Sequence, residues 1–491
     1  MLKNSFIYPV LVVGLMLAAT FTSFFWLQGQ SLRLDESQSL WQTSHSPGAL
    51  LSIVAQDVHV PLHHLLLHFW QLFFGNLVQT SRLLSLIFFV LTIPTVYITG
   101  RDAFGRNTGL FAAALIAVSP FLNWYGSEIR MYSLLTLLTA FSQLLFLRLL
   151  RGAKNRVWML YGLVCILGVF THYFFFLVLV TQLLFFIVYR QEFPKGANWK
   201  IFWVAAVIIL AFVPWLLYAY HLGFASSTQP LLDKPTTINL FGTYAEFIVG
   251  FQDDHLNTIF VSLWPLIVLL GFFSLQQGRK IPLQTRYFLL AGFLPILLVF
   301  AVSIALKPIY VSRYLIVAVP GLYLFLAWLI DSYPRSYSIP IKATIVALMI
   351  AGLAVQAGSA QTPVKENYEQ ASNYLQQHAS DQDIIILSAP FTVYPVEYYY
   401  QGSATIQTLP IWNRFQSGPV PPFIPSKLAS QVDSLASNHR IAWVLLSYDQ
   451  GYQKDIKSYF ETHYQQLSSQ LLSPGLTLYA YRLRYDPQLS L

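Results

Sequence analysis

Residues 31–68, SLRLDESQSLWQTSHSPGALLSIVAQDVHVPLHHLLLH, lie between the first two apolar stretches of the chain. Charged residues make up only 10% of the sequence, yet acidic residues and histidines are concentrated in this segment. They include Asp35, Glu36, Asp57, His59, His63, His64 and His68. Because ionisable side chains beside a bilayer are costly to hold, their concentration predicts a functional site in an outer loop of a membrane protein.

The composition is that of an integral membrane protein. Hydrophobic residues make up 55% and aromatic residues 16% of the chain, and the mean hydropathy is +0.53, well above the values of soluble domains. The single cysteine, Cys165, lies in an apolar run, so no intramolecular disulfide can form. The formal charge of +8 does not indicate a nucleic-acid partner, because the basic residues occupy short loops instead of one patch.

Apolar runs of about 20 residues predict membrane-spanning helices. We expect about eleven of them, near residues 6–27, 82–100, 108–123, 131–150, 157–171, 173–190, 200–220, 259–275, 287–306, 314–331 and 341–358. A break at Thr171-His172-Tyr173 is expected because 157–190 is long for one helix. The predicted fold class is a polytopic α-helical membrane protein with a soluble α/β domain at its C-terminal end.

The positions of Lys and Arg predict the orientation, since cytoplasmic loops are enriched in them. With the N-terminus in the cytoplasm, the inside segments hold Lys3, Arg101, Arg106, Arg148, Arg151, Lys154, Arg156, Arg190, Lys195, Lys200, Arg279, Lys280, Arg286, Arg335 and Lys342. The loops 28–81 and 221–258 and the tail then lie outside the plasma (inner) membrane. We expect loop 221–258 to be a mobile flap over a site.

Two domains are expected, a transmembrane module over 1–359 and an extracytoplasmic α/β domain over 360–491. Within the first outer loop, Ser46-Pro47 predicts the start of a short amphipathic helix, and Pro61 that of an apolar helix at the membrane interface. In the tail, we expect helices over 365–378 and 426–438 and buried strands at DIIILS (383–388), IAWVLLS (441–447) and LTLYAYRLR (476–484).

Asp35 and Glu36 follow the exit from the first predicted span. A group transfer onto a hydroxyl or an amine needs a base, such as a carboxylate, that takes the proton of the attacking group. Partial desolvation at the lip of a membrane would raise the affinity of such a carboxylate for that proton. The alternative is that the pair is interfacial and only marks a helix end, and spacing alone leaves both interpretations open.

The segment DVHVPLHH (57–64) is the second candidate. Pro61 restricts the backbone before it, so Asp57 and His59 could face the same site. There they would bind the donor phosphate or a divalent cation, although two such side chains are also ordinary capping groups. The remaining histidines, His63, His64 and His68, are interpreted as packing residues at the interface.

Three arginines lie at outer ends of predicted spans, opposite to the side where topology alone places positive charge. They are Arg82, which opens the second span; Arg130, which lies with Glu128 and Tyr132; and Arg313, which is followed by Tyr314. Guanidinium groups suit bidentate phosphate binding, and a phosphate leaving group must be held as its charge develops. Structural alternatives remain: Glu128 could pair with Arg130, and Arg313 could reach the headgroups. His172 and Tyr173 also face outward; they could line a sugar pocket or belong to the aromatic belt, and the aromatic belt is favoured.

Five motifs, taken together and in order, resemble the protein O-mannosyltransferase and aminoarabinose transferase family of GT-C membrane glycosyltransferases. They are the acidic pair 35–36, D-x-H-x-P-L-H (57–63), SRLLS (81–85), SPFLNWYGSEIRMYSL (119–134) and SRYLIVAVP (312–320). The resemblance covers roughly residues 1–330 and implies a multi-span fold with an extracytoplasmic active site. It also implies an inverting single displacement on a polyprenyl-phosphate-linked sugar, with Asp35 as the general base.

Further residues are assigned through the same resemblance. Glu36 matches the acidic neighbour of the O-mannosyl branch, His59 and Pro61 the H-x-P element, Arg82 the arginine of helix two, and Glu128 and Arg130 the E-x-R segment. The tail lacks a module typical of the eukaryotic O-mannosyl enzymes, which counts against a protein acceptor.

The sequence therefore predicts a hexosyl- or pentosyltransferase whose partners are a polyprenyl-phosphate sugar, an extracytoplasmic lipid, glycan or protein acceptor, and the bilayer. Dinucleotide, phosphate-loop and zinc signatures are absent from the sequence, no cofactor is certain, and a divalent cation is left open. One alternative is a transporter or flippase of lipid-linked sugars, which would place charges near helix midpoints. Another is a non-catalytic scaffold, which would scatter the outer arginines over the surface.

Overall fold

The structure is a computed structural model that describes residues 6–27, 29–223, 232–251, 258, 262, 281–359, 361, 363–415 and 420–483. Internal contacts divide the chain into two units. The helical unit comprises Met1–Gln28, Pro47–Phe224 and Pro230–Ser359, and the sheet unit comprises Gly29–Ser46, Ala225–Gln229 and Ala360–Leu491.

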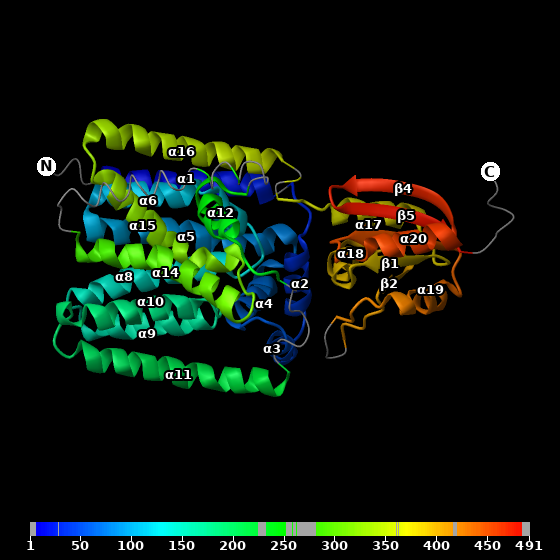
Figure 1. Cartoon of the computed structure of the whole chain (residues 1–491), viewed down its shortest axis with the longest axis horizontal. Helices are drawn as coiled ribbons and strands as arrows, with labels where there is room; N and C mark the ends of the chain where they lie inside the picture. Colours follow the sequence, from blue (N-terminus) through cyan, green and yellow to red (C-terminus); the bar gives the residue numbers. More distant parts are fainter. Residues whose placement is uncertain are drawn as a thin grey trace. The chain divides into compact units, whose positions relative to one another are not determined.

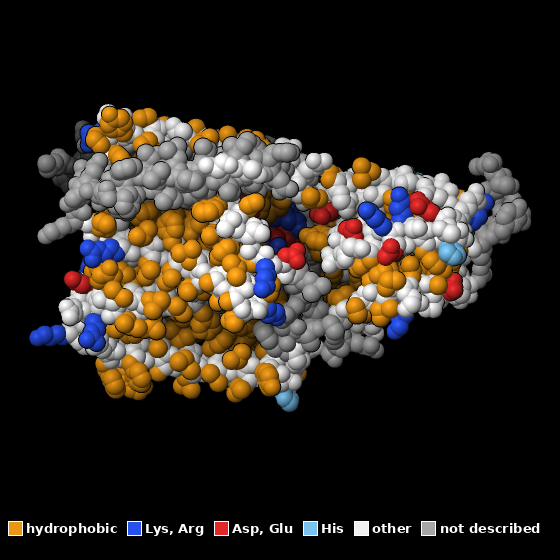
Figure 2. All heavy atoms as spheres, viewed as in Figure 1, with side chains coloured by type: hydrophobic (Ala, Val, Ile, Leu, Met, Phe, Trp, Pro, Cys, Tyr) orange, Lys and Arg blue, Asp and Glu red, His pale blue; other side chains and the backbone are white. Residues whose placement is uncertain are grey.

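The helical unit consists of long apolar helices and several shorter ones. Their bounds are α1 Ile7–Leu27, α3 Pro47–Gln56, α4 Leu62–Phe74, α5 Val78–Phe104, α6 Arg106–Val118, α7 Pro120–Gly126, α8 Tyr132–Leu150, α9 Asn155–Val169, α10 Phe175–Val188, α11 Ala197–His221, α12 Thr237–Val249, α14 Leu283–Ala305, α15 Val319–Asp331 and α16 Arg335–Gly358. The long helices run alongside one another (Figure 1). Hydrophobic side chains cover most of the flank that this unit exposes in Figure 2, as a protein surface in contact with lipid requires.

Several of these helices can span a membrane. In the described part of the chain, seven are long and apolar enough, or eight if α6 and α7, which are bent by 60° at their junction, form one span. The bend lies where Ser119 caps α7 and Pro120 begins it, because proline cannot continue the hydrogen-bond ladder of α6. The predicted break at 171–173 separates two shorter apolar helices, α9 and α10. The predicted span 259–275 lies almost wholly outside the described residues.

A close crossing joins α5 and α6 at two glycines. A Cβ atom on Gly100 would lie 2.7 Å from the Cα of Gly109, and one on Gly109 would lie 2.6 Å from backbone atoms of Arg101 and Tyr97. Only residues without a side chain let two helix backbones approach so closely. Gly100 and Gly109 therefore set the position of α6 against α5.

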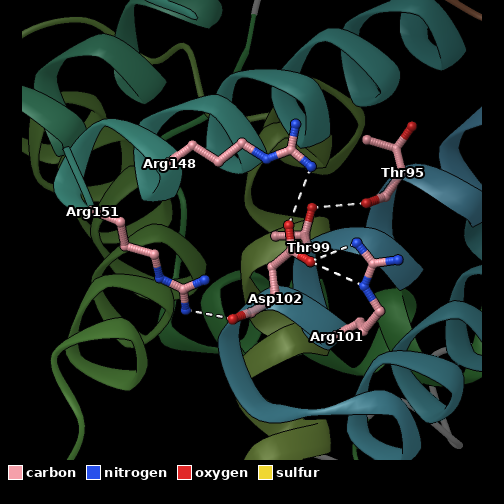
Figure 3. Close-up of polar contacts among 6 residues, drawn as sticks. All are labelled: Thr95, Thr99, Arg101, Asp102, Arg148 and Arg151. Atoms are coloured by element: carbon pink, nitrogen blue, oxygen red, sulfur yellow. Dashed lines mark hydrogen bonds and ion pairs between the residues drawn. The ribbon is translucent and has the colours of Figure 1, made fainter. Parts of the chain in front are cut away.

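One end of the helical unit carries basic residues that the orientation prediction assigned to inside loops. The Asp102 carboxylate, near the end of α5, accepts hydrogen bonds from Arg101 at 2.7 Å and from Arg148 of α8 at 3.2 Å (Figure 3). Arg151 donates to the backbone carbonyl of Asp102. Two of the predicted inside loops therefore lie together at this end, which is called the basic end below.

The helices α3 and α4 are the two short helices predicted in the first outer loop. The exposed apolar residues of α4 are Leu66, Phe69, Leu72, Phe73 and Phe74. Its buried side chains include His63 and His64. A helix with aromatic rings outward and histidines inward has the reverse polarity of a soluble amphipathic helix, and it suits a position at a membrane interface.

Part of the predicted flap is an anchored helix. The helix α12 begins with a capping box. Within it, the Phe247 ring lies 4.8 Å from that of Phe121, and its carbonyl accepts a hydrogen bond from the buried Tyr323 hydroxyl. α12 is thereby fixed to α7 and α15, so this part of 221–258 is a packed helix and not the loop we expected. The rest of that loop is only partly among the described residues.

The sheet unit is an α/β structure with helices on both faces of a five-stranded sheet. The helices are α2 Leu34–Thr43, α17 Tyr368–His378, α18 Val393–Tyr399, α19 Leu428–Ala436 and α20 Gln453–His463, and the strands are β1 Ile384–Ser388, β2 Thr405–Thr408, β3 Ile441–Ser447, β4 Gln465–Ser473 and β5 Leu476–Arg482. The order is β2-β1-β3-β5-β4, with β1 parallel to β2 and β3 and with β5 antiparallel to β3 and β4. Ile385 and Trp443 face the core under α17 and α18, whereas Ile384 and Ala442 face the core under α19 and α20.

The tail elements predicted from sequence are present as α17, α19, β1, β3 and β5, whereas β2, β4, α18 and α20 were missed. The helix α2 belongs to the sheet unit by its contacts. Its Trp41 ring lies 5.1 Å from the Tyr394 ring of α18. The segment that follows the first span therefore packs with the C-terminal residues, although the sequence assigned it to the transmembrane module.

Candidate functional site

The helices α5 and α8 have arginines near both of their ends. At the basic end, Arg101 and Arg148 both bind the Asp102 carboxylate. At the other end lie Arg82, in the first turns of α5, and Arg130, two residues before α8 begins. This second end holds the candidate site, because histidines surround its arginines.

Arg130 is buried and joins the segment between α3 and α4. One of its terminal nitrogens lies 2.8 Å from Nε2 of His59. Because a guanidinium can only donate, this Nε2 accepts and the imidazole is neutral. An Asp57 carboxylate oxygen lies 3.8 Å from the same Nε2, and the other accepts a hydrogen bond from the Val58 backbone N–H at 2.7 Å. The structure thus brings Asp57, His59 and Arg130 together.

Two more histidines from α4 lie beside this group. His63 and His64 are each 1% exposed, and the His64 ring stacks on His59 with 5.6 Å between centroids. Burial, aided by the charge of Arg130, lowers the pKa of His64 to about 3 and that of His63 well below its usual value. Among the described residues, the ring nitrogens of both have no hydrogen-bond partner. These two neutral rings add no charge of their own beside Arg130.

An aromatic group from three other segments lies on the same side. His172, in the turn between α9 and α10, has its ring 5.2 Å from Tyr314 and 6.3 Å from Tyr132. The Arg313 guanidinium lies 5.4 Å from the centroid of the Tyr314 ring. Burial, together with the charges of Arg130 and Arg313, lowers the pKa of His172 to about 3. The positive charges of Arg130 and Arg313 therefore both act on the His172 imidazole.

Arg82 and Glu128 flank Arg130. Arg82 is 1% exposed and lies one helical turn before Ser85, whose hydroxyl donates to the Arg130 carbonyl at 3.4 Å. Glu128 is also buried, in the turn between α7 and α8, where its carbonyl accepts from the Arg130 N–H at 2.7 Å. Residues three positions apart share a helix face, so Arg82 and Ser85 lie on the side of α5 that faces Arg130.

Asp35 and Glu36 belong to α2 in the sheet unit. A Glu36 carboxylate oxygen accepts a hydrogen bond from the Arg33 backbone N–H at 2.9 Å. This bond satisfies an N–H that the helix itself leaves free, so Glu36 acts as part of the cap of α2. Asp35, the neighbouring residue, is half-buried. Glu36 therefore stabilises the start of α2, whereas the structural alternative drawn from the sequence placed the pair at a helix end.

The sequence analysis named several buried histidines near the arginines but favoured structural roles for them. His63 and His64 were assigned to packing and His172 to an aromatic belt. A usable signal was the spacing from His59 through Pro61, since a helix that begins at proline places the next two histidines on its first turn. Glu246 of α12 was also missed; burial raises the pKa of its carboxyl, and Ser312, next to Arg313, partly offsets that rise.

Metal binding was left open for Asp57 and His59. Within the described part of the chain, no group of three or more His, Cys, Asp or Glu residues is placed to hold a metal ion. A divalent cation at Asp57 and His59 would need further ligands from outside that set.

The sequence matches one family model. Residues 58–218 match the family described as dolichyl-phosphate-mannose-protein mannosyltransferase. This range contains His59, Arg82 and Arg130, but not Asp35 or Arg313. No curated protein matches the sequence of the chain.

The fold is similar to those of solved proteins over nearly the whole chain. ArnT from Cupriavidus metallidurans in the apo state has a TM-score of 0.65 at 12% identity, over 97% of this chain and 98% of that one. The same protein bound to undecaprenyl phosphate has a TM-score of 0.61 at 12% identity, over 96% and 97%. The archaeal oligosaccharyltransferase AglB from Archaeoglobus fulgidus, in complex with an inhibitory peptide and a dolichol-phosphate, has a TM-score of 0.53 at 13% identity, over 97% and 74%.

Proposed function

We propose that this chain, a membrane protein with the fold of the GT-C glycosyltransferases, transfers a sugar from a polyprenyl-phosphate carrier to an acceptor outside the membrane. The fold and the family resemblance that five motifs predicted are confirmed by the family match and by the similarity to ArnT and AglB. The identity of the donor, the side of the membrane on which transfer takes place and the roles of individual residues are proposed here.

The observation that carries the proposal is the environment of Arg130. Its guanidinium is buried at one end of a bundle of apolar helices, hydrogen-bonded to His59 and close to neutral His64. A buried cation attracts an anion more strongly than an exposed one does, since it is poorly screened by water. A phosphate on a membrane-embedded lipid is an anion of suitable charge, and ArnT has been solved with undecaprenyl phosphate bound.

Arg82 and Arg313 supply the remaining positive charge in this proposal. Arg82 is buried and lies one turn before Ser85, whose hydroxyl binds the Arg130 carbonyl, and Arg313 lies against Tyr314 in the aromatic group. As the bond between the sugar and the phosphate breaks, negative charge grows on the leaving oxygens, and fixed guanidinium groups stabilise it. Tyr132 and Tyr314 would contact the sugar, while Asp57, His59 and Glu128 orient the arginines.

Asp35 is the proposed general base. The acceptor oxygen or nitrogen attacks the anomeric carbon, its proton passes to the Asp35 carboxylate, and the bond from that carbon to the phosphate oxygen breaks. The products are the glycosylated acceptor, with an inverted anomeric centre, and polyprenyl phosphate. Each residue in this scheme lies near the end of a helix or in a turn, whereas a path for transport would need charges near helix midpoints.

A transfer assay tests the scheme. The protein is reconstituted in vesicles with radiolabelled hexosyl- and pentosyl-polyprenyl phosphates and an acceptor extract from cells that lack the protein, and released polyprenyl phosphate is measured. Asp35→Asn should lower turnover by about 10²- to 10⁴-fold. Asp455→Asn, on the exposed side of α20, should keep the wild-type rate. Near wild-type turnover by folded Asp35→Asn would refute the proposed base, and no transfer with any donor would refute the proposed function.

A further inference from the structure

We propose that the sheet unit is a positioning part of the transferase, because it holds α2, and with it Asp35, at both ends. The inference rests on the proposed function for the role of Asp35. The contacts that carry it lie within the sheet unit alone. It gives the C-terminal domain a role in the reaction instead of one in acceptor capture.

The first attachment lies just before α2. The Leu32 backbone N–H donates to the Tyr399 hydroxyl of α18 at 2.9 Å, and the Glu369 N–H of α17 donates to the Ser31 hydroxyl at 3.2 Å. Leu32 is fully buried. Two helices of the C-terminal domain therefore bind consecutive residues of the chain directly before the helix that carries Asp35.

Charged groups add to this attachment. Arg33, the residue that caps α2, lies near Glu366 and Lys365 and influences the pKa of both: its charge partly offsets the rise that burial causes in the pKa of Glu366, and it adds to the fall that burial causes in that of Lys365. The Arg33 N–H also binds Glu36. The first turn of α2 is thus stabilised by its own cap, through Glu36, and by charged residues of the C-terminal domain near Arg33.

The second attachment lies at the other end of α2. The Trp41 ring lies 5.1 Å from the ring of Tyr394, and the Arg414 guanidinium lies 5.8 Å from the Trp41 centroid and 5.7 Å from that of Tyr394. Glu397 accepts two hydrogen bonds from Arg414, one of them at 2.9 Å. A bidentate carboxylate fixes the plane of a guanidinium. Glu397 therefore fixes the orientation of the Arg414 guanidinium that lies near the Trp41 ring.

These attachments limit the motion of a short helix. An isolated helix of 10 residues is unstable in water, so α2 depends on what it packs against. Asp35 is its second residue, between the contacts at Ser31 and Leu32 and those at Trp41. With both ends held, the helix cannot rotate about its axis, and the direction of the Asp35 side chain is set by the domain. Misplacing a reacting group by about 1 Å can cost about 10²-fold in rate.

Variants at the second attachment test the inference on the full-length protein. Trp41→Ala and Arg414→Gln should raise hydrogen exchange over Leu34–Thr43 while β1 and β3 stay protected, which shows that the domain is folded. Turnover should fall by about 10- to 100-fold, with the KM for the lipid-linked donor within about twofold. Trp41→Phe should restore most of the loss. Lys457→Gln, which removes an exposed ion pair with Glu461 on α20, is the control and should change neither exchange nor turnover.

The outcomes separate this inference from the proposed function. Faster exchange in α2 with wild-type turnover would overturn the positioning role, and unchanged exchange would overturn the attachment itself. A rise in KM for the acceptor alone, with kcat unchanged, would also overturn it, because that is the result expected of an acceptor-binding domain. If Asp35→Asn retains its turnover, the proposed function fails, whatever the variants at Trp41 and Arg414 do.

Discussion

Arg130 and His59 are hydrogen-bonded at 2.8 Å although they lie 71 residues apart in the sequence. The bond connects the loop that follows α3 with the turn that precedes α8, and its donor is necessarily the guanidinium. His59 therefore accepts through Nε2 and stays neutral while it orients the cation.

Replacement of Arg130 should weaken donor binding. Arg130→Gln removes the charge that we propose holds the donor phosphate, and loss of one charged hydrogen bond costs about 1.5–3 kcal/mol, or roughly 10- to 100-fold in affinity. The measurement is binding of polyprenyl phosphate to the purified protein in detergent. Arg148→Gln, at the basic end of the same bundle, removes a half-exposed contact with Asp102 and should leave affinity unchanged. Equal effects of both replacements would show that Arg130 has no special role.

Acidification should destabilise the helical unit through its buried histidines. The folded pKa of His64 is about 3, so between pH 6.5 and 3 the unfolded chain binds a proton that the folded one does not, and stability falls as the pH falls. Between pH 7 and pH 5 this amounts to about 2 kcal/mol for such a histidine. His64→Asn should therefore show a smaller drop in thermal midpoint over that range than the wild type. His378→Asn, at an exposed site on α17, should show the full drop.

A methyl group at the crossing of α5 and α6 should be costly. Gly109→Ala would place a Cβ 2.6 Å from backbone atoms of α5, and relief of such overpacking costs about 1–3 kcal/mol. We expect a lower thermal midpoint and less folded protein in membranes. Gly14→Ala in α1, where a Cβ meets nothing within 4 Å, is the control. A similar loss in both variants would mean that helix composition, and not the crossing, is responsible.

The anchoring of α12 should depend on one hydroxyl. Tyr323 donates to the Phe247 carbonyl and lies 2.9 Å from the Ser119 hydroxyl, all of them buried. Tyr323→Phe should cost about 1 kcal/mol locally and speed hydrogen exchange in Thr237–Val249 about fivefold. Tyr337→Phe, at an exposed ring on α16, should leave exchange there unchanged. Slow exchange in Tyr323→Phe would show that ring packing alone holds α12.

The sequence predicted most membrane helices, because about 20 consecutive apolar residues are a strong local signal. It did not predict the packed state of α12, since the sequence of this 13-residue helix gives no local sign that it packs against the Phe121 ring. The buried positions of His63 and His64 depend on how α4 is rotated about its axis. That rotation is fixed by tertiary contacts, such as the stacking of His64 on His59.

The packing partner of α2 could not be predicted from the sequence. The acidic pair of this helix was found from the sequence, but the packing of the helix against α18 depends on contacts such as Trp41 with Tyr394. Residues so distant in the chain leave no local pattern, whereas the strand DIIILS could be recognised from its own residues alone. The assignment of Glu36 was open for a similar reason: its contact with the Arg33 backbone is a matter of helix geometry.

The length of helix α5 sets the distance between the candidate site, which contains Arg82 and Arg130, and the basic end, which contains Arg101 and Arg148. From Arg82 to Arg101 it rises by about 28 Å, close to the hydrocarbon thickness of about 30 Å in a typical bilayer. If α5 spans the bilayer, this length would place Arg82 near the level of the lipid phosphates, where the proposed donor carries its own phosphate. Vesicles made from longer or shorter acyl chains should shift these two levels apart, so that the lipid composition alone alters the rate of the unmodified protein.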